Sequence, residues 1–77
     1  MDEILTILND LHSDIDFEHE ERLFERGLLD SFDIVTLVSE LAMQYGIQIM
    51  PKDIVPENFS SAATIHALVQ RILNEGR

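Results

Sequence analysis

Apolar residues recur at three- and four-residue spacing in three stretches of the chain, which is the period of an amphipathic helix. The first stretch covers residues 2 to 12, the second covers residues 32 to 45, and the third runs from Ser60 or Ser61 to Gly76. No stretch alternates between apolar and polar residues for long enough to predict a strand. The apolar positions of the two outer helices are Ile4, Leu5, Leu8, Leu11, Ile65, Leu68, Val69, Ile72 and Leu73. The pattern therefore predicts an all-α fold.

The predicted helices carry local signals that begin and end a helix. Asp30 or Ser31 can accept the first free amides of the second helix, and Gly46 can end it in the left-handed conformation, with Ile47 placed to close a Schellman contact. Proline at the first position of residues 56 to 59 favours a short helical turn. We expect one domain over residues 1–77, a bundle of three main helices plus one short helix. Its predicted core residues are Leu8, Leu11, Ile34, Val38, Leu41, Ile65, Leu68, Val69 and Ile72.

The connection between the first two helices is long and rich in apolar residues. It covers residues 12 to 30, whereas connections in helical bundles usually take about 2–8 residues. A mobile linker would not need these apolar residues, so we expect an ordered loop with a helical turn at Leu23–Arg26 that Gly27 ends. The apolar residues are Ile15, Phe17, Leu23, Phe24, Leu28 and Leu29. Such a loop is suited to positioning the residues that follow it, Asp30 and Ser31.

Composition narrows the classes of partner. The chain has 77 residues, a net charge of −10 and no cysteine, which excludes a disulfide scaffold, a thiol nucleophile and a cysteine-ligated metal site. Eleven acidic and two basic residues fall within residues 1–33. This charge repels nucleic acid and anionic lipid and favours partners with basic surfaces. We expect a soluble, monomeric, cytoplasmic protein, since the sequence has neither a membrane-spanning apolar run nor a basic leader.

One acidic series matches part of a calcium-binding loop. Five acids occupy positions 1, 3, 5, 7 and 12 of such a loop, but His19 stands at position 6, where a glycine makes the sharp turn. His12 and His66 have no metal-ligand spacing either. The five acids are Asp14, Asp16, Glu18, Glu20 and Glu25. We expect no dedicated metal site, and the lack of a glycine-rich phosphate loop or a Ser–His–Asp motif predicts that the chain is not an enzyme.

Ser31 is the candidate for chemistry. The simplest interpretation is that Asp30 or Ser31 only caps the second helix. However, a serine hydroxyl at a helix N-terminus, after an ordered loop, is exposed and held in place. A phosphate ester on that oxygen would be favoured by the free amides and the helix dipole, by roughly 0.3–1 kcal/mol at a surface. The position therefore suits a serine that receives a phosphate ester.

The order of motifs along the chain resembles the acyl carrier protein family. Residues 27 to 32, Gly-Leu-Leu-Asp-Ser-Phe, are similar to the Asp-Ser-Leu signature that opens the second helix of that family, with Phe32 in place of the commoner leucine. Residues 45 to 49 and 63 to 65 extend the resemblance over nearly the whole chain. It implies that a phosphopantetheinyl transferase moves a 4′-phosphopantetheine arm from coenzyme A to Ser31, and that Asp30 helps the transferase to recognise the serine. The arm's thiol would then carry an acyl or aminoacyl group as a thioester and deliver it to partner enzymes.

The resemblance leaves the cargo open. Carriers of fatty acid synthesis have a glutamate-rich second helix, whereas this helix has only two acids, Asp33 and Glu40. Where those carriers have glutamates, this chain instead has Thr36, Ala42, Met43 and Gln44. Residues 57 to 62 look more like stand-alone D-alanyl or other aminoacyl carriers, which an adenylating ligase loads. The implied partners therefore include an acyl- or aminoacyl-activating ligase, and both kinds of cargo remain alternatives.

The second helix also offers candidates for partner recognition. At 100° per residue, its core face is predicted to be Ile34, Val38, Leu41 and Tyr45, and one exposed stripe is predicted to be Asp33, Thr36, Glu40 and Gln44. Phe32, Ser39 and Met43 lie on the border, where Phe32 and Met43 either pack inward or anchor a partner. The candidate recognition residues are Asp30, Phe32, Asp33, Glu40 and Met43. The alternative function is an unmodified acidic interaction module in which Ser31 is only a cap.

Overall fold

The computed structural model describes residues 2–76, and within them it contains helices and no strand. The main helices are α1 (Asp2–Leu11), α2 (Ser31–Tyr45) and α3 (Ala62–Glu75). Two short 3₁₀ turns, η1 (Pro51–Asp53) and η2 (Pro56–Phe59), connect α2 to α3. The all-α prediction is confirmed, although η1 is a second short turn that the sequence did not predict. No helix in the described range is both long and apolar enough to cross a lipid bilayer.

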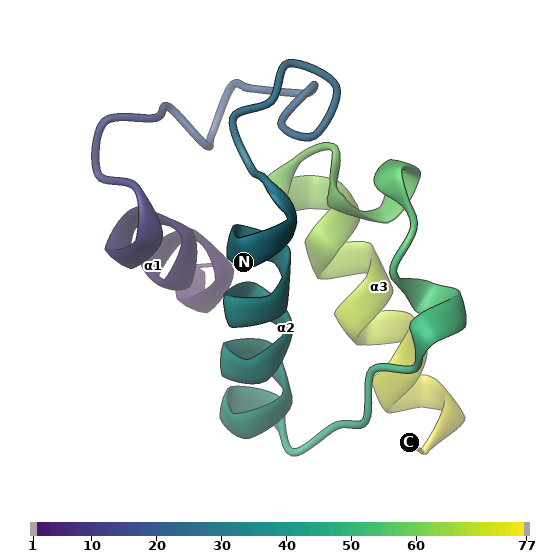
Figure 1. The fold of residues 1–77 in the computed structure, drawn as a ribbon. Helices are drawn as coiled ribbons and strands as arrows, with labels where there is room; N and C mark the ends of the chain where they lie inside the picture. The colour runs from purple at the N-terminus through teal and green to yellow at the C-terminus, as the bar shows by residue number, and fades with distance from the viewer. Residues whose placement is uncertain (1, 77) are drawn as a thin grey trace.

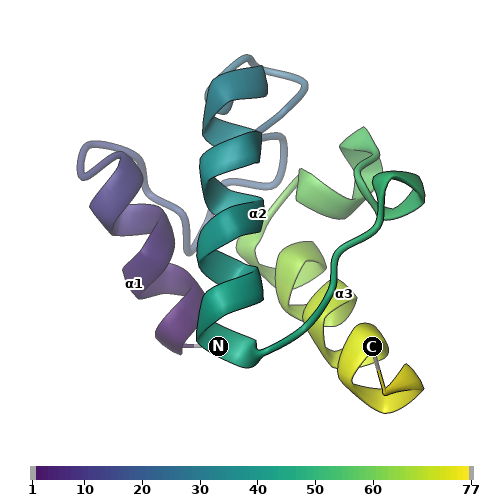
Figure 2. The ribbon, with the colours of Figure 1, turned by 60° about the horizontal axis from the view of Figure 1, so that its bottom comes forward.

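The helices form a small bundle in which α1 packs against both α2 and α3 (Figure 1). The loop after α1 crosses over one end of this bundle and delivers the chain to the start of α2. Figure 2 shows the connection through η1 and η2 on the side of α2 away from α1. In this arrangement the start of α2 lies at the end of the bundle that the long loop covers.

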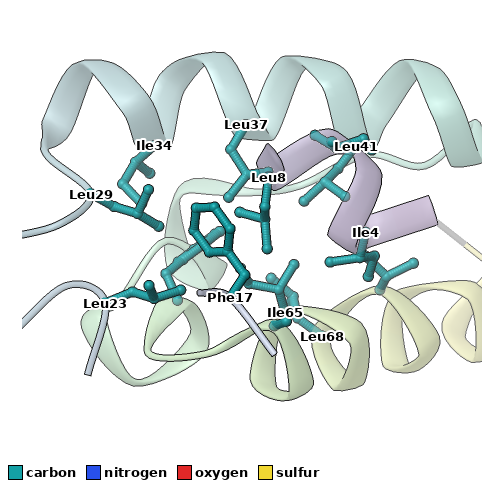
Figure 3. Close-up of a cluster of buried hydrophobic side chains, with 14 of the residues drawn as sticks. Ile4, Leu8, Phe17, Leu23, Leu29, Ile34, Leu37, Leu41, Ile65 and Leu68 are labelled. Carbon is teal, nitrogen blue, oxygen red and sulfur yellow. The ribbon is translucent and has the colours of Figure 1, made fainter. Parts of the chain in front are cut away.

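The core contains most of the predicted residues and shifts the buried face of α2. Seven of the nine predicted core residues are buried, whereas Leu11 and Val38 are half-buried. On α2 both Leu37 and Leu41 are fully buried, so the core face follows Ile34, Leu37 and Leu41. Figure 3 shows these side chains pointing toward those of α1 and α3. The core also includes Ile4, an apolar position of the first predicted helix. It further includes Ile7, Phe17, Leu23, Leu29, Ile47, Phe59 and Ala62, which the helical period alone did not assign.

The helix ends follow the local signals in the sequence. At the end of α2, Gly46 adopts a left-handed φ of 63°, and the amide of the buried Ile47 donates to the Ala42 carbonyl at 3.2 Å. This is the predicted Schellman contact. At the start of α3, the Ser61 hydroxyl accepts the amide of Thr64 at 3.1 Å, which makes Ser61 and not Ser60 the N-cap.

The loop over residues 12 to 30 is anchored by buried side chains, as predicted. Phe17, Leu23 and Leu29 are buried in the core. The backbone amide of Leu23 donates to the Ser60 carbonyl at 2.8 Å, and the Ser60 hydroxyl donates to Glu25 Oε1 at 3.1 Å. The predicted helical turn is a single hydrogen-bonded turn over residues 23 to 27, ending at Gly27 with a φ of 71°. These contacts tie the loop to the connection before α3.

A buried carboxylate fixes η1 against α3. Asp53 accepts the backbone amide of Met50 at 3.0 Å, and its Oδ1 atom lies 3.8 Å from Nη2 of Arg71 on α3. Asp53 is almost completely buried, so removing Arg71 would take away a cation that offsets the cost of burying this carboxylate. The chain between α2 and α3 is therefore held in place at η1 as well as at Ser60.

Phe17→Ala tests whether the loop is part of the folded core. Phe17 is 2% exposed, so we expect its removal to lower the free energy of unfolding by about 3–5 kcal/mol. The matched control is Phe24→Ala in the same loop, whose side chain is 37% exposed and whose loss should cost about 1 kcal/mol or less. Urea unfolding monitored by circular dichroism measures both. Equal losses for the two variants would contradict the assignment.

Candidate functional site

The start of α2 is capped by Asp30. Its Oδ1 atom accepts the backbone amide of Asp33 at 2.9 Å, and the Asp33 carboxylate in turn accepts the backbone amide of Asp30 at 3.3 Å. This reciprocal pair is a capping box with aspartate in both positions. The sequence left the cap open between Asp30 and Ser31, and the structure assigns it to Asp30.

Ser31 therefore has no capping role. It is the first residue of α2, its side chain is exposed, and its hydroxyl has no hydrogen-bond partner within residues 2–76. The backbone amides of Ser31 and Phe32 find no acceptor in the same range. An exposed hydroxyl and two free amides thus lie together at the positive end of the helix dipole.

A contact from the start of the long loop holds the capping pair. The Nε2 atom of His12, the residue after α1, lies 2.8 Å from Oδ2 of Asp33. The same oxygen receives the amide of Asp30. His12 and Asp33 are 21 residues apart in sequence, so their contact joins the two ends of the loop to the first turn of α2.

This contact corrects the predicted exposed stripe of α2. Asp33 and Thr36 are half-buried, because α1 and His12 pack against their side of the helix. Glu40 and Gln44, farther along the helix, are exposed as predicted. The carboxylate of Asp33 is therefore engaged by His12 within the molecule.

The contact shifts both pKa values toward the ion pair. The hydrogen bond to Asp33 raises the pKa of His12 above its ordinary 6.5, and the charges of Asp33, Asp14 and Asp30 add to it against the opposing effect of burial. Burial favours the neutral form of Asp33, yet the hydrogen bonds from His12 and from the Asp30 amide hold the pKa of Asp33 below its ordinary 3.8. The pair is therefore ionised in mildly acidic solution.

An apolar groove of about 250 Å³ adjoins Ser31. Three segments line it: the loop turn, the first turns of α2, and the chain from η1 to η2. The lining residues are Phe24, Ser31, Ile34, Val35, Ile54, Val55, Pro56 and Phe59. Phe24 was expected to help anchor the loop, but it is partly exposed and forms one side of this groove. The sequence does not show the groove, because its walls come from segments far apart along the chain.

An apolar stripe runs along the outer face of α2. Phe32 is 79% exposed, Met43 is 73% exposed, and Val35 between them is 66% exposed. The sequence left open whether Phe32 and Met43 pack inward, and the structure shows that both point to solvent. Val35 was not among the candidates, although its three-residue spacing from Phe32 is the signal that could have found it. We call Phe32, Val35 and Met43 the apolar stripe.

The acidic loop does not assemble the calcium-like arrangement. Asp16, Glu18 and His19 bring ligand atoms within 4.8 Å of one another, and all three are exposed. Glu20 instead accepts the backbone amide of Arg22, and Glu25 accepts the hydroxyl of Ser60. The remaining cluster is a set of solvated surface acids with one histidine.

Comparison with known families connects these observations. A family model described as the phosphopantetheine attachment site matches residues 2–72, which include α1, α2, both 3₁₀ turns and most of α3. The chain belongs to this family. No solved structure matches the chain. Members of the phosphopantetheine attachment family hold a covalent 4′-phosphopantetheine group and are carriers rather than enzymes, as the sequence predicted. Such carriers interact with a modifying transferase and with acyl-handling enzymes.

His12→Gln tests the contact with Asp33 through the pH dependence of stability. Because the pKa of His12 is raised in the folded state, His12 stabilises the fold. This contribution to the free energy of unfolding is complete below pH 6.5, the ordinary pKa, and is lost as the pH rises through the pKa of the folded state. The contribution of Asp33, whose folded pKa is lowered, is present above 3.8 and is lost as the pH falls through the folded value. Between these two pH limits, the partly exposed ion pair should contribute about 1 kcal/mol to the free energy of unfolding.

Urea unfolding of the wild type from pH 6 to 9 should therefore show a decrease in stability that His12→Gln lacks. The control is His19→Gln, which removes an exposed pair with Asp16 three residues away. It should follow the wild-type curve closely, because so local a contact can also form in the unfolded chain. A wild-type decrease that survives in His12→Gln would contradict the assignment.

Proposed function

We propose that Ser31 is the residue that receives the 4′-phosphopantetheine arm. The observation that carries this proposal is that Asp30, and not Ser31, accepts the Asp33 amide. The Ser31 hydroxyl is thus left exposed and without a hydrogen-bond partner among the described residues 2–76. The order of the motifs adds to it, since Ser31 follows the Asp of the family signature.

The surroundings of Ser31 fit a phosphate ester. The unpaired amides of Ser31 and Phe32 and the helix dipole favour an anion at this position. The Asp30 carboxylate is engaged by the Asp33 amide, so hydrogen bonding offsets part of its repulsion toward a phosphate. When attached, the arm supplies a thiol, which this chain lacks because it contains no cysteine.

The chain itself contributes position and not acid–base chemistry. In the modification, the Ser31 oxygen would form a bond to the phosphorus of coenzyme A that carries the pantetheine. The phosphoanhydride bond from this phosphorus to the nucleotide half would break, the nucleotide half would leave, and the hydroxyl proton would pass to a base. Within residues 2–76 no side chain accepts a hydrogen bond from that hydroxyl, and His12 is engaged with Asp33. The base therefore belongs to the transferase, which explains why the serine must be accessible.

We infer that partner enzymes dock on the apolar stripe and its acidic surroundings. Phe32 and Met43 are large, exposed and on the same helix as Ser31, and aromatic residues and Met are enriched in interface cores. Asp30 and Glu40 are exposed acids nearby that suit basic surfaces on a partner. Asp33 contributes by holding Asp30. The net charge of −10 opposes self-association, which supports a monomer, and a coenzyme A donor supports a cytoplasmic location.

The cargo we propose is an acyl or aminoacyl group held as a thioester on the arm. Residues 57 to 62 and the scarcity of acids on α2 favour the D-alanyl or aminoacyl alternative, loaded by an adenylating ligase. The match to the phosphopantetheine attachment family over residues 2–72 favours the carrier over the unmodified interaction module.

Intact mass after co-expression with a broad-specificity phosphopantetheinyl transferase tests the attachment residue. The wild type should gain the mass of one arm, and Ser31→Ala should gain nothing. The matched control is Ser39→Ala, an exposed serine on the same helix, which should be modified like the wild type. Modification of Ser31→Ala, or an unmodified wild type with a transferase that is active on another carrier, would exclude Ser31.

Transfer kinetics test the docking surface. Phe32→Ala and Met43→Ala should each lower kcat/KM for modification or loading about tenfold, as expected for an interface anchor worth about 1.4 kcal/mol. The control is Leu73→Ala on α3, an exposed leucine outside the stripe. Thermal melting should be unchanged for the stripe variants, because these side chains already face solvent. Equal kinetics for all three variants would exclude the stripe.

A further inference from the structure

We propose that His12 is a positioning residue for the modification of Ser31, and that it acts through Asp33 to hold the serine in the conformation that the transferase modifies. This inference rests on the proposed attachment at Ser31 and goes beyond it. His12 lies outside the motif around the serine, at the other end of the long loop.

His12 is held by α1 on one side and by α2 on the other. Its backbone amide donates to the carbonyl of Leu8 at 3.0 Å, which extends the hydrogen bonding of α1 by one residue. The side chain of Leu8 is fully buried in the core. The Nε2 atom of His12 lies 2.8 Å from Oδ2 of Asp33. The imidazole therefore joins a helix end that the core fixes to the first turn of α2.

A chain of hydrogen bonds connects His12 to the backbone before and after Ser31. The Asp33 oxygen that faces His12 also accepts the backbone amide of Asp30 at 3.3 Å, and Asp30 accepts the amide of Asp33 at 2.9 Å. Ser31 lies between these two residues in the chain. Its hydroxyl has no hydrogen-bond partner within residues 2–76. The position of the hydroxyl therefore depends on the backbone that this capping box holds.

The contact of His12 with Asp33 is shielded from solvent, unlike a second contact of the same kind. The side chains of His12 and Asp33 are 34% and 16% exposed. His19 and Asp16 also approach to 2.8 Å, but they are 79% and 68% exposed and only three residues apart. Water and salt screen exposed pairs strongly. The His12 pair is screened less, and it alone of the two reaches the start of α2.

The charged groups around His12 are carboxylates. The hydrogen bond to Asp33 raises the pKa of His12 most, and nearby negative charges add to it against the effect of burial. His12 is therefore positively charged in mildly acidic solution and loses this charge as the pH rises. The carboxylates are Asp33 and Asp30 at the start of α2, Asp14 in the loop, and Asp10 and Glu40, which line the groove between α1 and α2.

Loss of the charge on His12 should slow the modification for two reasons. A neutral imidazole binds the Asp33 carboxylate less strongly, so the capping box opens more often and the first turn of α2 frays. The uncompensated carboxylate also repels the anionic phosphates of coenzyme A. Both effects lower the rate as the pH rises. A base that took the Ser31 proton would show the opposite dependence, because loss of its own proton would activate it.

Steady-state kinetics with a broad-specificity phosphopantetheinyl transferase and coenzyme A test this role. At pH 6, His12→Gln should lower kcat/KM about fivefold, the factor that corresponds to an ion pair worth about 1 kcal/mol. The loss should appear in kcat and not in KM, because the docking surface is unchanged. The matched control, His19→Gln, should behave like the wild type. Equal kinetics for both variants, or a loss confined to KM, would overturn the inference.

The pH profile separates the charge of His12 from its packing. The ratio of kcat/KM between the wild type and His12→Gln is measured from pH 6 to 9. The transferase titrates equally in both measurements, so its own pH dependence cancels. We expect the ratio to fall from about 5 toward 1 as the pH rises through the folded-state pKa of His12. A ratio that stays constant over this range would assign His12 a purely structural role and overturn the inference.

A double-mutant cycle with Asp33→Asn tests whether His12 acts through Asp33. The asparagine keeps an oxygen that can accept the Asp30 amide, but it removes the charge. In this background His12→Gln should have no further effect on kcat. A full fivefold loss there would overturn the inference. If circular dichroism shows that His12→Gln does not fold, the ratio between the wild type and Asp33→Asn over the same pH range decides, because it must fall in the same way.

Intact mass separates this inference from the proposed function. A wild type that gains the arm at Ser31 and shows none of these kinetic effects leaves the attachment intact and overturns only the role of His12. A wild type that gains no arm, or gains it at another residue, overturns the proposed function and this inference with it.

Discussion

The reciprocal hydrogen bonds between Asp30 and Asp33 are the constraint on which the functional end of the molecule depends. A helix N-terminus must find acceptors for its free amides, and in this chain one carboxylate on each side of Ser31 takes part. Because Asp30 supplies the cap, the serine between the two aspartates keeps its hydroxyl for other chemistry. His12 completes the arrangement by holding Asp33 from the start of the long loop.

The long loop explains how so small a domain can hold this arrangement in place. Ordering nearly twenty residues without regular structure has a large entropic cost, which the burial of Phe17, Leu23 and Leu29 offsets. The same loop delivers Asp30 to the start of α2 and places Phe24 beside Ser31. Core packing and site geometry are therefore properties of one segment.

Two apolar surfaces that share Val35 adjoin the proposed attachment point, and they differ in shape. The stripe of Phe32, Val35 and Met43 is convex and exposed along a helix, so it suits a partner's concave surface. The groove toward Ile54 is concave and has a volume of about 250 Å³. The negative charge of the protein surrounds both and favours basic partners over a second copy of the chain.

The sequence alone determined the features that local physics controls. Helical period, the glycine at the end of α2 and the buried residues of the loop predicted the bundle, its boundaries and the exposed position of Ser31, because such signals act over a few residues. Tertiary structure decided the rest. The contact of His12 with Asp33, the rotation of α2 that buries Leu37 and the groove beside Phe24 depend on how distant segments meet. Those meetings follow from packing the whole core at once, which no local pattern specifies.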